Sequence, residues 1–447
     1  MRAARRHAKL ASMPIQCAEH AFLPAGWAHG HDQAVAVGTE THVRWRLAGL
    51  PNLHSHAFQR AMAGLAERQS HPEDSFWTWR ELMYRFAGRI TPDAMRAVAT
   101  QLYVEMLEAG FTTVCEFHYL HHQPDGRPYD DPAEMSHALI AAARDAGIRL
   151  TLLPVLYMRG GFDGRPLSER QRRFGHSLET FWSLLQTLRA QQDDALAVGI
   201  ALHSLRAVPE TALRDVLAAV AGQPMPIHIH VAEQVGEVQD CLALRGARPV
   251  EWLLANADVD ERWTLVHATH LEPAEIQGIV RSGATVAICP TTEANLGDGL
   301  FPLGDFLKAG GRWGIGSDSH VSVSPVEELR WLEYGQRLQT RHRNIAVSPN
   351  QPSTGELLYS QALQGGLRAC GQGDRASGDF IVLDAEAPAL AGATRDDLLD
   401  RFVFAGNRPL VRETHVGGVR VVTQGQHRDR EAVARRYTRA MAQLLAD

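Results

Sequence analysis

Short apolar runs alternate with longer amphipathic stretches along most of the chain. The runs are rich in aliphatic and β-branched residues, as expected of parallel strands that are buried on both faces. The stretches between them, such as 92–110 and 132–147, open with a Pro and close on a Gly, as helices tend to. The predicted strands are the one that ends at His54 and the runs 112–120, 149–158, 196–205, 225–233, 263–270, 284–293 and 312–319. Eight strand–helix units in succession predict an α/β fold, a (β/α)8 TIM-like barrel, whose functional residues lie at the C-terminal ends of the strands.

The chain extends beyond the barrel on both sides. Residues 15–48 contain the runs QCAEHAFL, AVAVG and HVRWRL, and residues 376–424 contain DFIVLD, RFVFAG, PLVRETHV and VRVVTQ, which all resemble short strands. We expect these two flanks to pair into a small β-sandwich beside the barrel. The predicted organisation is therefore an N-terminal part of the sandwich at 1–48, the barrel at 49–375, and the rest of the sandwich with a terminal helix at 376–447.

The composition of the chain indicates which kinds of molecule the protein binds and in which compartment it lies. The net charge is −6 and no long basic block is present, so we expect no nucleic-acid partner. Nowhere do eighteen apolar residues run together, so we expect no membrane partner and a small-molecule substrate. The cysteines are odd in number, scattered and never arranged as CxxC, which argues against disulfides or a thiolate zinc site and favours the reducing cytoplasm. They are Cys17, Cys115, Cys241, Cys289 and Cys370.

Histidines and carboxylates stand where several predicted strands end. His54 and His56 are two residues apart, so both side chains point to the same face of a strand. With 22 histidines in the chain, one such pair is weak evidence by itself, because many histidines are only hydrogen-bonded. Further polar residues at strand ends are His228, His230 and Glu233 on the fifth strand, His267 on the sixth and Asp318 on the eighth. Three histidines and a carboxylate with an open position are what a hydrolytic zinc centre needs.

The motifs HSH at 54–56, HVAE at 230–233, VH at 266–267 and GSDS at 316–319 together resemble the amidohydrolase superfamily, and within it the aminohydrolases that release ammonia. The resemblance implies one Zn2+ per subunit, or another divalent metal, and a hydrolytic reaction of a metal-activated water. The implied metal ligands are His54, His56, His230 and Asp318. The implied catalytic residues are Glu233 as proton shuttle, His267 and Asp318. His228 shares a face with His230, but the HxxE spacing selects His230.

Lysine is almost absent from the chain, which contains only Lys9 and Lys308. Neither lies near the end of a predicted barrel strand, so a binuclear site bridged by a carboxylated lysine is excluded. The same scarcity disfavours pyridoxal phosphate and a P-loop, and the PCxxC signature of the other class of zinc deaminases is missing.

Longer stretches resemble one family, the formimidoylglutamate deiminases. They are NLHSHAFQRAMAGLAE, SFWTWRELMYR, EFHYLHH, ALHSLRAV, HIHVAEQ and GSDSHVSVSPVEELRWLEYGQRL. This resemblance implies the hydrolysis of N-formimino-L-glutamate to N-formyl-L-glutamate and ammonia in histidine degradation. The substrate has two carboxylates, and guanidinium is the side chain suited to bidentate carboxylate binding. The implied substrate-binding residues are Gln59, Arg80, Tyr119, His203 and Arg206. Arg80 lies in the aromatic segment 68–91, which we expect to be a long loop that acts as a lid or a subunit contact.

Two alternatives stay open at this point. Another aminohydrolase or chlorohydrolase of the superfamily would use the same metal site on a cyclic amidine such as a nucleobase. A non-enzymatic scaffold would lack metal ligands, and none is missing. We expect a homodimer, and the sequence leaves open whether Arg80 acts in its own or in a partner subunit's site.

Overall fold

The computed structural model describes residues 17–28, 42–69 and 76–446 of the chain, and every predicted barrel strand is present. The strand predicted at 196–205 is interrupted at Gly199 and so consists of two parts, β7 and β8. The barrel strands are β4 (Leu50–Ser55), β5 (Phe111–His118), β6 (Arg149–Leu156), β7 (Leu196–Val198), β8 (Ile200–Ser204), β9 (Ile227–Val231), β10 (Trp263–His267), β11 (Thr285–Ile288) and β12 (Arg312–Ile315). Nearly all of their residues are buried, which explains why they appear in the sequence as continuous apolar runs.

The strands are parallel and follow the order β12, β11, β10, β9, β8, β6, β5, β4, with β7 paired to β6. The two ends of this sheet meet at a parallel bridge between Ser55 and Asp318. Two backbone hydrogen bonds support the bridge, from Asp318 N to His54 O (2.9 Å) and from His56 N to Asp318 O (3.2 Å). The barrel is therefore nearly closed, and its closure brings the HSH and GSDS motifs together. The predicted barrel is confirmed.

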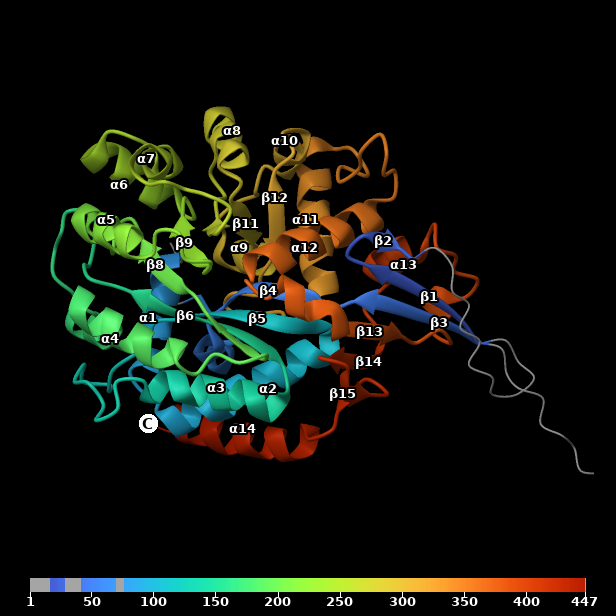
Figure 1. Cartoon of the computed structure of the whole chain (residues 1–447), viewed down its shortest axis with the longest axis horizontal. Coiled ribbons are helices and arrows are strands. Elements are labelled where there is room, and N and C mark those ends of the chain that lie inside the picture. The colour runs from blue at the N-terminus through green and yellow to red at the C-terminus, as the bar shows by residue number, and fades with distance from the viewer. Residues whose placement is uncertain (1–16, 29–41, 70–75, 447) are drawn as a thin grey trace, which may run out of the picture.

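Helices surround the barrel (Figure 1). The helices predicted from 92–110 and 132–147 are confirmed as α2 and α3, and each ends at a Gly in the left-handed conformation, Gly110 or Gly147. The helices are α1 (Phe76–Ala87), α2 (Pro92–Ala109), α3 (Glu134–Ala146), α4 (Leu178–Arg189), α5 (Glu210–Ala219), α6 (Val235–Arg245), α7 (Pro249–Asn256), α8 (Pro273–Ser282), α9 (Pro290–Leu296), α10 (Leu303–Lys308), α11 (Pro325–Thr340), α12 (Thr354–Ala369), α13 (Leu398–Phe404) and α14 (Arg430–Leu445). Short 3-10 helices are η1 (Ala57–Met62), η2 (Glu169–Phe174), η3 (Gly373–Gly378) and η4 (Pro388–Leu390). No helix in the described part of the chain is both long and apolar enough to cross a membrane.

Two local predictions were wrong. The segment 68–91 was expected to be a loop, but α1 occupies Phe76–Ala87 and buries Met83 and Phe86 on one face. The run RFVFAG was expected to be a strand, but it lies mostly in α13, which buries Leu399 and Phe402 at helical spacing. In both segments the aromatic and β-branched composition obscured a helical period.

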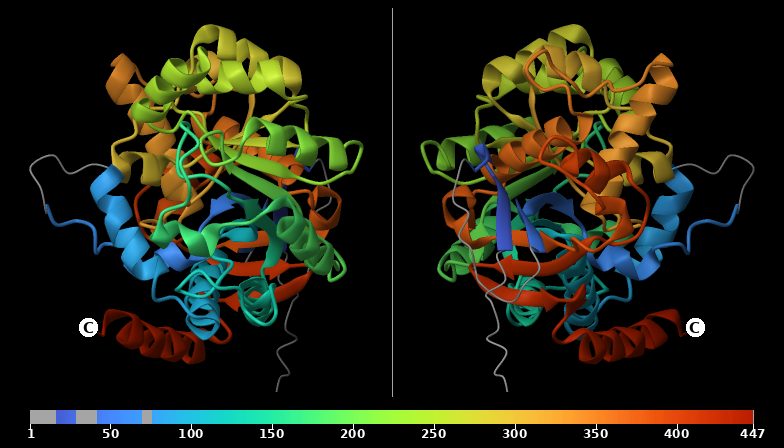
Figure 2. Two further views of the ribbon diagram at one scale, coloured as in Figure 1. Left: turned by 90° about the vertical axis from the view of Figure 1, so that its left-hand side faces the viewer. Right: turned by 90° about the vertical axis from the view of Figure 1, so that its right-hand side faces the viewer.

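The two flanks form a small β domain on one side of the barrel, as predicted. Its strands make one seven-stranded sheet in the order β16, β15, β14, β13, β3, β1, β2, in which β1 and β3 are parallel and the other pairs antiparallel. They are β1 (Cys17–Leu23), β2 (Gly26–Trp27), β3 (His42–Ala48), β13 (Phe380–Leu383), β14 (Val411–Val416), β15 (Val419–Thr423) and β16 (Gln426–His427). Figure 2 shows the blue N-terminal strands next to the red C-terminal strands. The predicted strand AVAVG lies outside the described residues, and the domain boundaries at 48/49 and 375/376 stay predictions.

Candidate active site

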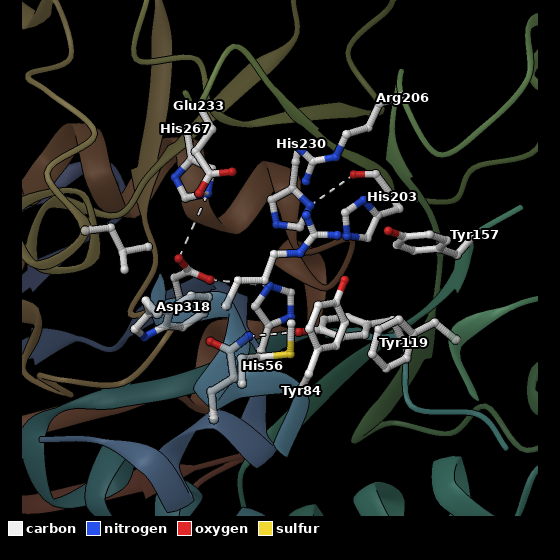
Figure 3. A pocket seen from close by; sticks show the side chains of 16 residues that line it. His56, Tyr84, Tyr119, Tyr157, His203, Arg206, His230, Glu233, His267 and Asp318 are labelled. Atoms are coloured by element: carbon white, nitrogen blue, oxygen red, sulfur yellow. Dashed lines mark hydrogen bonds and ion pairs between the residues drawn. The ribbon is translucent and has the colours of Figure 1, made fainter. Parts of the chain in front are cut away.

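The four residues predicted as metal ligands come together at the mouth of the barrel. Figure 3 shows three of them, His56, His230 and Asp318. His54 and His56 lie at the end of β4, His230 lies in β9, and Asp318 follows β12. Each offers one ligand atom, and these atoms all lie within 4.8 Å of one another. His54 Nε2 lies 3.1 Å from His56 Nε2 and 3.0 Å from His230 Nε2. Asp318 Oδ1 lies 3.2 Å from His54 Nε2 and 3.3 Å from His56 Nε2.

The protonation state and the orientation of the three imidazoles suit the binding of a cation. Burial lowers the pKa of each ring, so the neutral form is favoured. His56 Nδ1 donates to the carbonyl oxygen of Phe117 (2.9 Å), and His230 Nδ1 donates to that of His203 (3.0 Å). These two rings therefore turn the lone pair of Nε2 toward the common point. Lone pairs and a carboxylate that face one point repel one another unless a cation lies between them, so this set of donors fits a divalent metal.

A buried hydrogen-bond network supports the β4 end of this cluster. Glu116 accepts hydrogen bonds from Ser55 Oγ (2.5 Å), the backbone N–H of Ala57 (2.7 Å) and the hydroxyl of Tyr103 (3.1 Å). Burial raises the pKa of Glu116 to about 7. On the other side, His320 Nε2 accepts the backbone N–H of His56 (3.2 Å). This network was not predicted from the sequence, although a glutamate inside the apolar run TTVCEFHYL was a signal for a buried hydrogen-bond acceptor.

Glu233 and His267 lie beside the cluster. His267 is the last residue of β10, and its Nε2 lies 3.8 Å from Glu233 Oε1 and 4.0 Å from Asp318 Oδ2. Burial by itself would lower the pKa of His267, but the neighbouring carboxylates, Glu233 foremost, hold it at about 10. Burial raises the pKa of Glu233. Both predicted proton-transfer residues thus lie at the same end of the barrel as the four-residue cluster.

The carboxylate of Glu237, on α6, holds the backbone at the end of β9. Its Oε1 accepts the N–H of Ala232 (3.2 Å), and its Oε2 accepts the N–H of Glu233 (3.1 Å). Ala232 has a φ of 53°, a left-handed conformation that costs about 1 kcal/mol or more in a residue with a Cβ. The two hydrogen bonds stabilise this turn, which directs the Glu233 side chain into the cavity. The role of Glu237 was also not predicted from the sequence.

One cavity joins the cluster to the residues predicted to bind substrate. Its lining includes His56, His230, Glu233, His267 and Asp318, whereas His54 is fully buried and is not part of the lining. Figure 3 shows Arg206, His203 and Tyr119 around the same space. All five predicted substrate-binding residues are among its lining: Gln59, Arg80, Tyr119, His203 and Arg206.

Two arginines bring positive charge to this cavity. Arg206 follows β8 and is half-buried, and its Nε is buried without a hydrogen-bond partner among the described residues. Burial opposes the charged form, yet the pKa of Arg206 is raised because Glu237 lies nearby. Arg80 comes from α1, with its guanidinium carbon 5.2 Å from the centre of the Tyr84 ring. An unpartnered buried N–H is costly, so Arg206 favours an anionic ligand.

Aromatic residues that the sequence analysis did not single out complete the lining. Tyr157, at the end of the β6 run, stacks edge-on against His203 with ring centroids 4.4 Å apart. Its hydroxyl accepts a hydrogen bond from Gln171 Nε2 (2.9 Å). The other aromatic residues are Trp79, Tyr84 and Phe174, and Met83 also belongs to the lining. For Trp79 and Tyr84 the signal in the sequence was the aromatic segment around α1, whose position at the cavity only the fold reveals.

Comparisons with known proteins agree with this geometry. A sequence model of the Amidohydrolase family matches residues 45–354. Formimidoylglutamate deiminase of Pseudomonas aeruginosa is 52% identical over 448 aligned residues, which cover 96% of this chain and 99% of that protein. A 5-methylthioadenosine/S-adenosylhomocysteine deaminase of Natronomonas pharaonis is 27% identical and covers 89% of this chain and 86% of its own. The crystal structure of an amidohydrolase from Brucella melitensis superposes with a TM-score of 0.89 at 45% identity, over 98% of this chain and 100% of its own.

Proposed function

Since this chain belongs to the amidohydrolase family, we propose that it hydrolyses N-formimino-L-glutamate to N-formyl-L-glutamate and ammonia. The observation that carries this proposal is Arg206, which lines the same cavity as residues of the metal-binding cluster and whose buried Nε has no hydrogen-bond partner among the described residues. A guanidinium favours carboxylates, and this substrate has two. The relative from Pseudomonas aeruginosa that is 52% identical carries the name of this activity.

We assign His54, His56, His230 and Asp318 to one Zn2+ per subunit. Three neutral imidazoles and a carboxylate are a typical set of zinc donors, and Fe2+ or Mn2+ accepts the same atoms. When bound, the metal lowers the pKa of a coordinated water from 15.7 toward about 7 and so supplies a nucleophile at neutral pH.

The two oxygens of Asp318 have different neighbours. Oδ1 lies beside His54 and His56, while Oδ2 lies 4.0 Å from His267 Nε2. We propose that Oδ1 would bind the metal and that Oδ2 accepts the proton that leaves the attacking water. The water oxygen bonds to the formimino carbon, and the C=N double bond becomes single.

Glu233 then delivers a proton to the imino nitrogen, because burial raises the pKa of its carboxyl group and so favours a proton-carrying form. His267 stabilises the charge that develops on the oxygen and nitrogen atoms bonded to the reacting carbon. The proton held by Asp318 passes to the same nitrogen, and the C–N bond to that nitrogen breaks, so ammonia leaves. The former water oxygen gives its remaining proton to the Glu233 carboxylate and becomes the formyl oxygen.

The remaining lining residues orient the substrate. We assign Arg206 and Arg80 to its carboxylates. The Tyr119 hydroxyl accepts from Gln59 Nε2 (2.9 Å), so its own O–H stays available for a ligand oxygen. His203 Nδ1 is hydrogen-bonded to Ser204 Oγ (3.0 Å), which leaves Nε2 for the substrate.

The test is ammonia release by purified, zinc-loaded protein given N-formimino-L-glutamate, with a chelated sample and the variants R206A and R214A beside it. Arg214 is an exposed arginine paired with Glu210, so R214A controls for the loss of a cation. We expect release by the wild type and by R214A, none after chelation, and about a 100-fold lower kcat/KM for R206A. A folded, metal-loaded wild type that releases no ammonia from this substrate would reject the proposal.

A second candidate is the deamination of a cyclic amidine, which the 27% identical relative named 5-methylthioadenosine/S-adenosylhomocysteine deaminase favours. An uncharged ring offers no carboxylate to the guanidinium of Arg206. Guanine, cytosine and adenosine in the substrate panel separate the two candidates. A non-enzymatic scaffold is expected to lack one or more of the metal ligands, whereas all four predicted ligands lie together in this protein.

We propose that the protein is a homodimer of the cytoplasm. Four buried cysteines are free, in keeping with a reducing compartment: Cys115, Cys241, Cys289 and Cys370. Arg80 lines the cavity of its own subunit, which supports a role there. Size-exclusion chromatography with light scattering measures the oligomeric state.

A further inference from the structure

Glu293 is a buried carboxylate next to the site that the proposed function does not use. It lies on α9, and its Oε1 accepts a hydrogen bond from His267 Nδ1 at 3.3 Å. The same oxygen accepts the backbone N–H of Cys289 at 2.9 Å. The carboxylate therefore connects the first turn of α9 to the imidazole at the end of β10.

This contact fixes the orientation of the imidazole. The two nitrogens lie on different edges of the ring, so Glu293 on the Nδ1 edge leaves Nε2 toward Glu233 Oε1 (3.8 Å) and Asp318 Oδ2 (4.0 Å). Whether the ring is neutral or protonated, Nδ1 keeps its proton for Glu293. The backbone of His267 gives little support of its own, since its φ of 67° is strained for a residue with a side chain.

We propose that Glu293 is the positioning residue of His267. It holds one nitrogen of the ring and thereby aims the other at the reacting atoms. The inference rests on the proposed function for the role of His267 in the reaction, but the orientation itself follows from the contacts above.

Two other roles compete with this one. His267, Cys289 and Glu293 each offer an atom within 4.8 Å of the others, which is compatible with a second metal. Burial keeps the Cys289 thiol protonated by raising its pKa, and Glu293 Oε1 already accepts two hydrogen bonds, so this group is poorly suited to a cation. The other role is purely structural, as a cap of α9.

The chain offers a matched control for the structural role. Glu328, on α11, is also buried and also binds the start of α9, through the backbone N–H (2.9 Å) and hydroxyl (2.6 Å) of Thr291. Within the described part of the chain, Glu328 makes no hydrogen bond or ion pair with His267. A Gln at either position keeps an oxygen that accepts a backbone N–H, but the E293Q substitution replaces the carboxylate that binds Nδ1–H with an amide.

The experiment compares E293Q and E328Q in the zinc-loaded protein. We expect E293Q to lower kcat by about 100- to 10,000-fold and to change the pH profile of kcat, as loss of a carboxylate that orients a catalytic imidazole does elsewhere. E328Q is expected to keep kcat within about threefold of the wild type, even where it lowers the Tm. Both variants should hold the same single zinc as the wild type.

A readout independent of turnover is the NMR signal of the His267 Nδ1 proton, assigned by its loss in H267N. We expect a strongly downfield proton in the wild type and in E328Q that is absent or shifted upfield in E293Q. The proposal is overturned if E293Q keeps this signal, if it loses no more activity than E328Q, or if the wild type holds two zinc ions and E293Q one. Failure of the wild type on N-formimino-L-glutamate would instead count against the proposed function, because the NMR comparison needs no substrate.

Discussion

His230 and His203 are joined by a 3.0 Å hydrogen bond from the Nδ1 of the first to the backbone carbonyl of the second. A metal-ligand candidate on β9 is thus oriented by the main chain of β8, while the His203 side chain lines the cavity. His203 therefore contacts both parts of the site. Its backbone carbonyl orients the metal-ligand candidate His230, and its side chain faces the cavity predicted to bind substrate.

The first prediction separates these two functions. H203A keeps the carbonyl that orients His230, so we expect full zinc content, measured by atomic absorption, and a raised KM. H230A removes one of the four proposed ligands. We expect this variant to lose most of its zinc, because each ligand contributes strongly to the affinity of the site for the metal. Loss of zinc in H203A would show that its side chain supports the metal.

The second prediction concerns Glu233. E233Q keeps the size of the side chain but cannot deliver a proton, so we expect zinc to stay bound while kcat falls by about 100- to 10,000-fold. Steady-state ammonia release measures the change, and E431Q, on the exposed face of α14, is the control. Near-normal turnover by E233Q would remove Glu233 from the role of proton shuttle.

The third prediction concerns Glu237, which accepts the N–H groups of Ala232 and Glu233. E237A leaves both buried donors without a partner, and each costs about 1–3 kcal/mol, so we expect a lower free energy of unfolding. Because the turn before Glu233 loosens, kcat should fall as well, with zinc content unchanged. Urea unfolding and ammonia release on the same samples check both effects. A stable E237A with normal kcat would contradict the role given to this carboxylate.

The fourth prediction is a loss of stability in acid. Burial lowers the pKa of His118 and of His176 to about 3, whereas an unfolded histidine titrates near 6.5. Between these values the unfolded state binds more protons, so stability falls as the pH drops below about 6.5, by about 1.4 kcal/mol per pH unit and group.

Replacing His176 by Gln removes one of these titrations. Between pH 7.5 and 5.5, the loss in free energy of unfolding should therefore be about 1.4 kcal/mol smaller for H176Q than for the wild type, as measured by urea unfolding. Equal losses for both proteins would mean that His176 is not held neutral in the folded state.

Much of the barrel could be predicted because parallel strands buried on both faces leave continuous apolar runs, and each run such as TTVCEFHYL corresponds to a strand. The prediction was wrong for 68–91 and for RFVFAG, where a helix buries one face of an aromatic segment. Local composition there resembled loop or strand, and packing against the rest of the protein decided the outcome.

The sequence by itself determined which chemical groups stand at the ends of the strands, because the two-residue period of a strand puts both histidines of HSH on one face and the barrel order puts all strand ends on one rim. Only the tertiary structure decided which groups meet there. Glu237 and Glu293 look like ordinary charged residues in the sequence, and the apolar run around Glu116 indicates burial but not its partners. Each of the three becomes part of the site through contacts that the closed barrel brings into reach. Hydrogen bonds act over about 3 Å, so such partners follow from the packing of strands and helices and not from spacing along the chain.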